Sequence, residues 1–390
     1  MSKLDKLINE LCPSGVTYLP LGALCKIETG KLNANAAVEN GSYAFFTTAK
    51  EVSRIDKYRW DTEALLIAGN ANVGDVKHYI GKFEAYQRTY VLTKFEDQVN
   101  IRFLYHVLKN NLKSYLDGHK NEAAMTYIVL STLTDFRIPL PPLEVQQEIV
   151  RILDNFTELT AELTAELTAR RKQYEHYRDE LLTFGDDVER KMIGDVIVSL
   201  NTGLNPRQFF KLNPEGANNY YVTIREIQNN TIVLSEKTDK IDDAALQLCN
   251  NRSNLEIGDV LFSGTGTIGE TAIITEYPHN WNIKEGVYTI KPKKECLSSK
   301  YLMYLLHTEP IRTAILKKAA GGTVKSVPMA EMKKIFIPLP PLGKQQEIVS
   351  ILDRFDTLCN DLTSGLPAEI TARQKQYEFY RDKLLTFKEL

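Results

Sequence analysis

The sequence has 390 residues, of which 43% are hydrophobic and 25% are charged, and its formal net charge is −2. This length allows two or more domains with complete hydrophobic cores, and the composition excludes a disordered or fibrous protein. No apolar run is long enough to span a bilayer, and the N-terminus, Met1-Ser-Lys-Leu-Asp-Lys6, lacks the apolar region of a signal peptide.

The five cysteines are scattered through the chain and never occur in C-x-x-C spacing. They are Cys12, Cys25, Cys249, Cys296 and Cys359. An odd, scattered set argues against a disulfide framework or a zinc ribbon and fits a reducing compartment. We therefore expect a cytoplasmic protein.

In chain order, the sequence predicts two β-rich modules that alternate with two long helices. The segments are an N-terminal stretch at 1–16, a first module at 17–142, a central helix at 143–187, a second module at 188–341 and a C-terminal helix at 342–390. Within the modules, short β-branched and aromatic runs bounded by Gly and Asn predict strands, at Ala64–Ala68, Thr89–Leu92, Asp259–Phe262 and Val287–Ile290. Each module then ends in a helix-like stretch, Ile101–Lys113 and Ser299–Lys317.

The two long helices are near copies of each other. Ile138-Pro-Leu-Pro-Pro-Leu143 recurs at 337–342, Gln146-Gln-Glu-Ile-Val150 at 345–349, and Ile152-Leu-Asp-Asn-Phe156, with one change, at 351–355. A longer block at 169–184 recurs at 372–387, so the second copy is four residues longer, about one helical turn. The chain therefore contains an internal duplication.

Each copy carries an apolar stripe with steps of three or four residues. The stripe contains Phe156, Leu159, Leu163, Leu167, Arg170, Tyr174, Tyr177 and Leu181 in the first copy, and Phe355, Leu358, Leu362, Leu366, Ile370, Arg373, Tyr377, Tyr380 and Leu384 in the second. Some forty residues of helix span about 60 Å, more than one small domain covers, so we expect the two stripes to pack together as a long antiparallel pair. Gly365 and Pro367 predict that the second helix kinks or restarts there.

The charge differs between these segments. Residues 16–137 hold 15 Lys and Arg against 13 Asp and Glu, residues 191–336 hold 18 against 15, and residues 144–187 hold 5 against 11. The modules are thus mildly basic, whereas most of the excess acid lies on the first helix. This distribution permits a nucleic-acid surface on the modules and disfavours one on that helix.

One motif resembles a nucleotide-binding loop. Gly264-Thr-Gly-Thr-Ile-Gly269 has the spacing G-x-G-x-x-G, but a dinucleotide site needs a helix next, and Thr271-Ala-Ile-Ile-Thr275 reads as a strand. The corresponding segment of the first module, Gly69-Asn-Ala-Asn-Val-Gly74, keeps only the outer glycines. We therefore predict a hairpin turn in both modules.

Catalytic motifs are missing. The chain has no G-x-x-x-x-G-K-[ST], H-E-x-x-H or G-x-S-x-G, and no N-P-P-[YF] or D-P-P-[YF] tetrapeptide that would hold a target base. The six histidines form no ligand-spaced pair. The sequence thus predicts neither an enzyme nor a metal site.

The repeated Pro-Leu-Pro-Pro-Leu, Gln-Gln-Glu-Ile-Val, Ile-Leu-Asp and Lys-Gln-Tyr-Glu blocks strongly resemble the specificity (S) subunit of type I restriction-modification systems, over the whole chain. The resemblance implies an α+β fold with a pseudo-two-fold arrangement, in which two target recognition domains are separated by a pair of long antiparallel, coiled-coil-like helices. Thr160-Ala-Glu-Leu163 and Thr164-Ala-Glu-Leu167 look like the tetrapeptide repeat of one subgroup, whose copy number sets the target spacing.

The same resemblance implies the partners. Each module would read one half of a bipartite site in double-stranded DNA, the helices would dock two methylation (M) subunits, and restriction (R) subunits would join them. S-adenosylmethionine, ATP and Mg would then be bound by the partner subunits and no cofactor by this chain. Membrane association is not expected.

Candidate DNA-binding residues are the polar side chains of the Gly- and Asn-rich loops. Arg suits guanine edges, Asn and Gln suit adenine edges, and Lys and Thr often contact phosphates. In the first module they are Lys31, Asn33, Asn35, Asn70, Asn72, Gln87 and Arg88. In the second they are Arg207, Gln208, Arg225, Arg252, Thr265, Thr267 and Lys325.

Two other functions compete with DNA recognition. A pure assembly scaffold would bind proteins through both modules, but near-identical helices beside divergent modules favour two readers of different targets. A self-sufficient methyltransferase would need the catalytic tetrapeptide that the sequence lacks.

Overall fold

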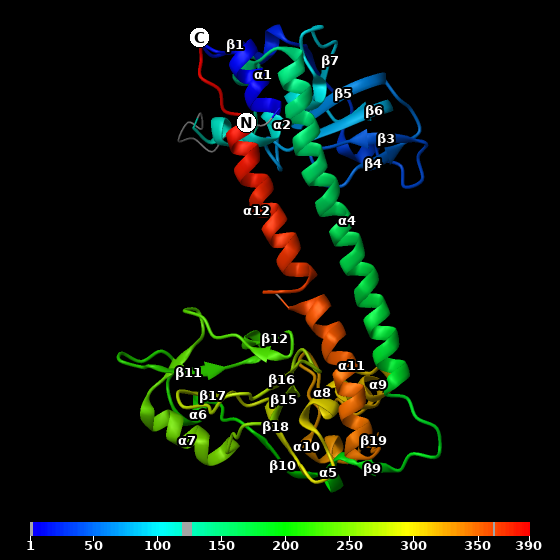
Figure 1. Ribbon diagram of the computed structural model, residues 1–390, viewed down its shortest axis with the longest axis vertical. Coiled ribbons are helices and arrows are strands. Elements are labelled where there is room, and N and C mark those ends of the chain that lie inside the picture. The colour runs from blue at the N-terminus through cyan, green and yellow to red at the C-terminus, as the bar shows by residue number, and fades with distance from the viewer. Residues whose placement is uncertain (1–2, 119–126, 362) are drawn as a thin grey trace. The chain divides into compact units, whose positions relative to one another are not determined.

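The computed structural model describes residues 3–118, 127–361 and 363–390. Contacts between Cα atoms divide the chain into two compact units, which we call unit 1 (Met1–Glu162 with Thr371–Leu390) and unit 2 (Leu163–Ile370). The division passes through helices α4 (Leu143–Leu181) and α12 (Leu366–Leu384), so each unit contains one module and parts of both repeated helices (Figure 1). The predicted α+β class and duplication are confirmed.

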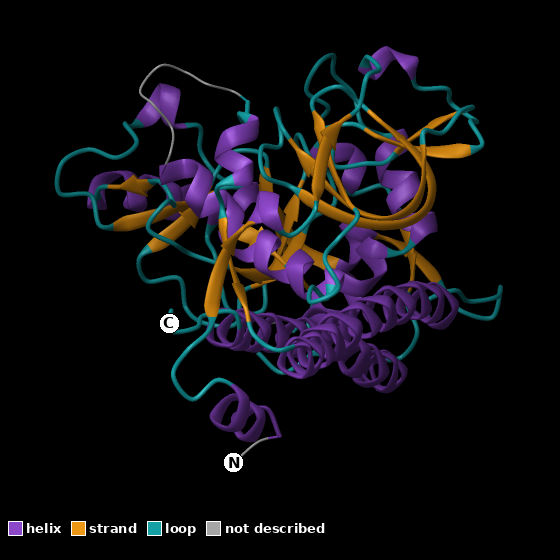
Figure 2. Cartoon of the chain, turned by 90° about the horizontal axis from the view of Figure 1, so that it is seen from above, coloured by secondary structure: helices purple, strands orange, loops and turns teal. Residues whose placement is uncertain are grey.

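Unit 1 is built on a six-stranded sheet with the order β2-β7-β5-β6-β3-β4. The strands are β2 (Lys26–Thr29), β3 (Tyr43–Phe46), β4 (Ser53–Ile55), β5 (Trp60–Ala68), β6 (Val76–Ala85) and β7 (Thr89–Thr93). Successive side chains of a strand point to opposite faces, so Leu65 and Ile67 of β5 join one core and Ala64 and Leu66 join another. Figure 2 shows the strands of the chain twisted rather than flat.

Helix α2 (Ile101–Gly118) contributes the apolar face that covers this sheet. Its residues Phe103, Leu104 and Val107 are fully buried and share one core with Leu65 and Ile67. The other elements of unit 1 are α1 (Lys3–Leu11), β1 (Thr17–Pro20), the 3-10 turns η1 (Leu21–Ala23) and η2 (Ala34–Ala36), α3 (Leu130–Thr134) and β8 (Arg137–Leu140).

The two ends of the chain meet in unit 1. The backbone amide of Val16 donates to the carbonyl of Lys388, and the amide of Leu390 donates to the carbonyl of Val16. The hydroxyl of Tyr18, on β1, donates to the carbonyl of Phe387. The segment that follows the C-terminal helix is therefore hydrogen-bonded to the start of the first module.

Unit 2 repeats the sheet topology of unit 1. Its four-stranded sheet has the order β10-β18-β15-β16, which matches β2-β7-β5-β6, and a second sheet has the order β14-β11-β17. The strands are β9 (Arg190–Met192), β10 (Ile197–Thr202), β11 (Asn219–Val222), β12 (Ile227–Gln228), β13 (Thr231–Ile232), β14 (Lys240–Ile241), β15 (Val260–Ser263), β16 (Thr271–Ile273), β17 (Trp281–Ile283), β18 (Val287–Pro292) and β19 (Phe336–Pro338). The helices are α5 (Ile193–Val196), α6 (Pro206–Phe209), η3 (Ile224–Glu226), α7 (Asp243–Ser253), α8 (Ser299–His307), α9 (Glu309–Lys317), α10 (Met329–Met332) and α11 (Leu342–Asn360).

One sequence prediction is corrected in unit 2. The stretch Ser299–Lys317 is not one helix but two, α8 and α9, with Thr308 in an extended conformation between them. Pro310 lies in the first turn of α9. Because proline lacks a backbone N–H and its ring clashes with the preceding turn, a helix can begin there but cannot continue through it.

The C-terminal helix is interrupted where the sequence predicts a restart. Helix α11 ends at Asn360 and α12 begins at Leu366, with Pro367 in its first turn. Gly365 is buried at this break, and a Cβ built there would lie 2.5 Å from the carbonyl oxygen of Thr357, so no larger residue fits. Leu362 of the predicted stripe lies outside the described residues.

Both units pair α4 with the C-terminal helix in antiparallel fashion. In unit 2 the ring of Tyr177, near the end of α4, stacks on Phe355 of α11 with centroids 5.7 Å apart. In unit 1 the early residues of α4 face α12. Three stripe residues, Tyr177, Leu358 and Tyr380, are exposed, and the other described stripe residues are half-buried or buried.

Candidate nucleic-acid interface

Each module presents a tight turn between two antiparallel strands. The turn at 69–75 joins β5 to β6, and the turn at 264–270 joins β15 to β16. In the first, the amide of Gly74 donates to the carbonyl of Ala68; in the second, the amide of Gly269 donates to the carbonyl of Ser263. The G-x-G-x-x-G segment is thus followed by strand β16 and not by a helix, which confirms the predicted hairpin and removes the geometry of a pyrophosphate site.

A neighbouring segment of the chain holds each turn in the same way. The amide of Ile128 donates to the carbonyl of Gly69, and the amide of Val327 donates to that of Gly264. Asn70 forms a β-bridge with Tyr127, and Thr265 forms one with Ser326. Tyr127 and Ser326 are not among the residues predicted from the sequence, although the correspondence between Gly69 and Gly264 locates the two turns that they contact.

A tyrosine lies close to the first glycine of each segment, and at Gly69 the carbonyl oxygen of Arg88 is closer still, 2.5 Å from a built Cβ. The hydroxyl of Tyr90 donates to the carbonyl of Ile128, and the hydroxyl of Tyr288 donates to that of Val327. A Cβ at Gly264 would lie 2.1 Å from the ring of Tyr288, and one at Gly69 would lie 3.0 Å from the ring of Tyr90. The two turns are therefore equivalent in backbone and differ in the side chains they present.

In unit 1 the predicted residues gather on three adjoining segments. Leu32 forms a bridge with Tyr86, and the amide of Gln87 donates to the carbonyl of Leu32, so the loop with Lys31, Asn33 and Asn35 lies along the turn with Gln87 and Arg88. The amide of Gly69 donates to the carbonyl of Arg88, which adds the hairpin to the set. Lys31, Asn33, Asn35, Gln87 and Arg88 are exposed.

The two hairpin asparagines differ in how they are held. The Asn72 side-chain amide donates to the carbonyl of Thr48 at 2.7 Å. The side-chain oxygen of Asn70 is buried and has no hydrogen-bond partner among the described residues. Arg88 places its guanidinium 5.2 Å from the ring centre of Tyr127, the residue bridged to Asn70. The arrangement leaves one amide acceptor and one guanidinium beside the turn.

In unit 2 only part of the predicted set is brought together. Thr265 contacts the hydroxyl of Ser326 at 2.9 Å, and the carbonyl of Lys325 accepts from the amide of Gly266, so Thr265, Thr267 and Lys325 share one hairpin. Thr267 and Lys325 are exposed.

The other second-module candidates lie on separate elements. Arg207 is exposed in α6, Arg252 is exposed in the last turn of α7, and the side chain of Gln208 lies outside what the structure describes. Arg225 is in η3, where its guanidinium forms a 2.8 Å ion pair with Asp239. No hydrogen bond or ion pair within the described part of the chain joins Arg207, Arg225 or Arg252 to the hairpin.

A buried glutamine anchors each repeated helix to its module. The side-chain amide of Gln146 donates to the carbonyls of Gln98 and Pro141, and its oxygen accepts from the amide of Asn100. Gln345 makes the equivalent three bonds, to Cys296, Pro340 and Ser298. Both side chains are fully buried.

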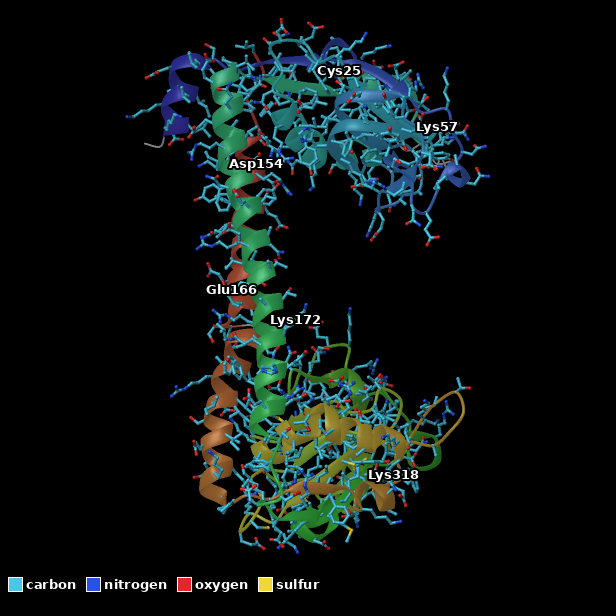
Figure 3. All side chains as sticks on the ribbon, turned by 90° about the vertical axis from the view of Figure 1, so that its right-hand side faces the viewer. Cys25, Lys57, Asp154, Glu166, Lys172 and Lys318 are labelled. Atoms are coloured by element: carbon cyan, nitrogen blue, oxygen red, sulfur yellow. The ribbon has the colours of Figure 1, made fainter. Side chains whose placement is uncertain are left out.

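An aspartate about two helical turns later makes a second anchor. Asp154, labelled in Figure 3, bonds Arg102 at 3.0 Å and His106 at 2.9 Å, both on α2. Asp353 bonds Lys300 at 2.6 Å and the hydroxyl of Tyr304 at 2.7 Å, both on α8. The helix residues are thus repeated, whereas their partners on the modules differ.

In the first of these clusters, burial and hydrogen bonding set the protonation states of Asp154 and His106. Burial alone would raise the pKa of Asp154, but the hydrogen bonds from Arg102 and His106 outweigh it and hold that pKa below its usual value. Burial lowers the pKa of His106 by more than the contact with Asp154 raises it. Asp154 is therefore ionised while His106 is neutral.

Among residues 3–118, 127–361 and 363–390 there is no group of three or more His, Cys, Asp or Glu side chains arranged to hold a metal ion. In the same residues no helix is long and apolar enough to cross a membrane.

Comparisons with known proteins agree with this geometry. The family model described as "Type I restriction modification DNA specificity domain" matches twice, at residues 13–170 and 185–372. A putative type I restriction enzyme specificity subunit from Haemophilus influenzae is 33% identical over 406 residues, 98% of each chain. The specificity subunit of the type I restriction enzyme EcoR124I/EcoR124II from Escherichia coli is 29% identical over 412 residues, 99% of this chain and 97% of that one.

Solved structures share the fold. The S subunit of a type I restriction-modification system from M. genitalium superposes with a TM-score of 0.59 at 14% identity, over 95% of this chain and 96% of that one. A chain from a study of complex assembly in the type I R-M system gives a TM-score of 0.60 at 16% identity, over 96% and 98% of the two chains.

Proposed function

Because its two halves both match one family model, the chain belongs to the type I restriction-modification DNA specificity family, and we propose that its two modules read the two halves of a split DNA site for partner enzymes. It is a specificity subunit in this proposal, and the chemistry is performed elsewhere. The cofactors S-adenosylmethionine, ATP and Mg would be bound by methylation and restriction subunits.

The observation that carries the proposal is the pair of equivalent hairpins with unlike side chains. Asn70 and Asn72 occupy the first turn, where Thr265 and Thr267 occupy the second. The Asn72 amide already donates to the carbonyl of Thr48, so Asn72 offers a base its side-chain oxygen, whereas a threonine hydroxyl discriminates less and often contacts phosphate. Two copies of one scaffold that differ at their tips suit two different half-sites.

The near-identical helices support a second part of the proposal, the docking of two methylation subunits. The first helix carries an excess of acidic residues, 11 against 5 basic ones in 144–187, which makes it a poor surface for DNA phosphates. Two copies of one helical sequence suit two copies of one partner. An assembly scaffold without DNA recognition is the competing function, and the difference between the hairpins disfavours it.

The experiment is to produce the chain with its adenine methylation subunit in a methylation-deficient host and to map modified bases by single-molecule sequencing. We expect methyladenine in both halves of one split motif, and none when this chain is omitted. The matched pair N70A/N72A and T265A/T267A should each relax one half of the motif and leave the other intact. A soluble complex that adds no methylation, or variants that relax both halves alike, would favour the scaffold.

A further inference from the structure

Unit 1 contains a groove of about 880 Å³ beside the hairpin at 69–75. Four lysines line it from three places in the fold: Lys50 after β3, Lys77 on β6, and Lys109 with Lys113 on α2. Two carboxylates, Asp75 and Asp117, also border the groove. Positive charge therefore exceeds negative charge on its walls.

The lysines are only partly neutralised within the chain. The ammonium of Lys77 lies 2.9 Å from Asp75, and that of Lys109 lies 3.0 Å from the hydroxyl of Tyr105. Lys50 and Lys113 are exposed, and neither forms an ion pair with another described residue. Lysines that line one groove repel one another. An anion that enters the groove therefore binds with a more favourable electrostatic free energy than it would at an isolated lysine.

The fold does not require these lysines. Arg102 and His106 are hydrogen-bonded to Asp154, and Lys300 and Tyr304 are hydrogen-bonded to its duplicate Asp353. Arg102 and Lys300 therefore occupy equivalent positions, as do His106 and Tyr304. The same offset of 198 places His307, the last residue of α8, opposite Lys109, and His307 is hydrogen-bonded to Thr271. At this offset in the sequence, beyond the break at Thr308, Ile311 replaces Lys113 and is buried in the core of unit 2. The second module thus uses these residues for internal contacts, and the first presents charge.

We propose that this lysine groove holds the phosphate backbone of duplex DNA next to the bases that the first module reads. The inference rests on the proposed function and adds a contact that fixes the DNA without selecting its sequence. Asn72 and Ala71 of the hairpin also line the groove, so backbone and base contacts would adjoin each other. Lys109 and Lys113 are one helical turn apart on the same face of α2, which lets both approach one strand.

The test uses the complete complex with methylation subunits and compares two triple variants. K50Q/K109Q/K113Q removes three charges from the groove, and K6Q/K57Q/K94Q removes three exposed lysines that do not line it, including Lys57 of Figure 3. Binding to a duplex with the methylated motif is measured at several salt concentrations. Each lost phosphate contact reduces the slope of log affinity against log salt by about 0.9, so we expect the groove variant to lose about 2–3 units of slope.

We also expect the groove variant to methylate the same motif as the wild type, at a lower rate, and K50R/K109R/K113R to restore the slope. A slope equal to that of the control triple would overturn the proposal. So would loss of binding to the methylation subunit with the DNA slope unchanged, because the groove would then serve an acidic protein surface. If the proposed function itself is wrong, the wild-type complex shows no motif-specific binding. If only the groove proposal is wrong, the wild-type complex binds its motif, and the groove variant and the control variant show the same salt dependence.

Discussion

The ring of Phe156 on α4 stacks on the ring of Tyr380 on α12, with centroids 5.5 Å apart and an angle of 22° between the planes. Its duplicate, Phe355, stacks on Tyr177, the duplicate of Tyr380. Each copy of the repeated helix therefore supplies the phenylalanine of one pair and the tyrosine of the other. This exchange is what an antiparallel pairing of two near-identical helices produces.

The first prediction concerns this pair in unit 1. F156A and Y380A should each lower the free energy of unfolding by about 1–2 kcal/mol, and the double variant should lose less than the sum by about 0.5–1.5 kcal/mol, because stacked aromatic rings interact beyond their buried area. Denaturant unfolding of the four proteins measures the coupling. E158A, at an exposed position of the same helix, is the control and should change the stability by less than about 0.5 kcal/mol. Strict additivity of F156A and Y380A would argue against the stacking.

The second prediction concerns the buried glutamines. Q146L removes three hydrogen bonds and leaves the carbonyls of Gln98 and Pro141 and the amide of Asn100 without their partner. A buried unsatisfied group costs about 1–3 kcal/mol, so we expect a loss of about 2–5 kcal/mol by denaturant unfolding.

The sequence offers a matched control for each glutamine. Gln147 and Gln346 are the next residues along the same helices and are exposed. Q147L and Q346L should leave stability almost unchanged, whereas Q345L should repeat the effect of Q146L in unit 2. Equal effects of Q146L and Q147L would contradict the anchoring role.

The third prediction concerns pH. Burial, followed by the charges of Arg178 and Arg312, lowers the pKa of His307 to about 4. The unfolded chain protonates this imidazole first, near its ordinary pKa of 6.5, so its contribution to stability is complete above about pH 6.5 and is lost as the pH falls from there to about 4. The loss should be about 3 kcal/mol. Measuring the free energy of unfolding of the wild type and of H307Q across this pH range isolates the contribution of His307. The difference between the two proteins should change only between pH 6.5 and about pH 4. A difference that stays constant with pH would contradict the prediction.

The fourth prediction concerns the turn backbones. Ala71 has a φ of +54°, and the equivalent Gly266 has a φ of +78° with open space where a Cβ would lie. G266A should therefore cost about 1–2 kcal/mol from backbone strain alone, and A71G should be neutral or stabilise by up to about 1 kcal/mol. Thermal unfolding measures both. Stabilisation by G266A would show that the left-handed conformation is not required.

The fifth prediction concerns the tetrapeptide repeat within α4, which runs without interruption from Leu143 to Leu181. A third Thr-Ala-Glu-Leu unit after Leu167 adds about 6 Å of helix, and duplex DNA rises about 3.4 Å per base pair. The gap between the half-sites should grow by one or two base pairs while both half-sites stay the same. Methylation mapping measures the gap, and an unchanged motif would contradict the spacer role.

Helices, turns and strands could be predicted from the sequence because their signals depend on neighbouring residues, and the duplication could be predicted because whole blocks of sequence recur. The repeated blocks revealed the two copies, the heptad-like steps predicted the helix pair, and Gly365 with Pro367 located the break between α11 and α12. The strand after Gly269 followed from its β-branched residues, which is enough to distinguish a hairpin from a dinucleotide fold.

The tertiary structure alone decided which polar residues act together. Gln146 looks like its neighbour Gln147 in the sequence, yet one is buried on three backbone groups and the other faces solvent. Lys50 and Lys113 are 63 positions apart and meet at one groove, while Arg225, chosen for its residue type, is engaged by Asp239. The physical reason is range: helix and turn signals depend on residues three to five positions apart, whereas a hydrogen bond or a shared electrostatic field depends on distances that exist only once the chain has folded.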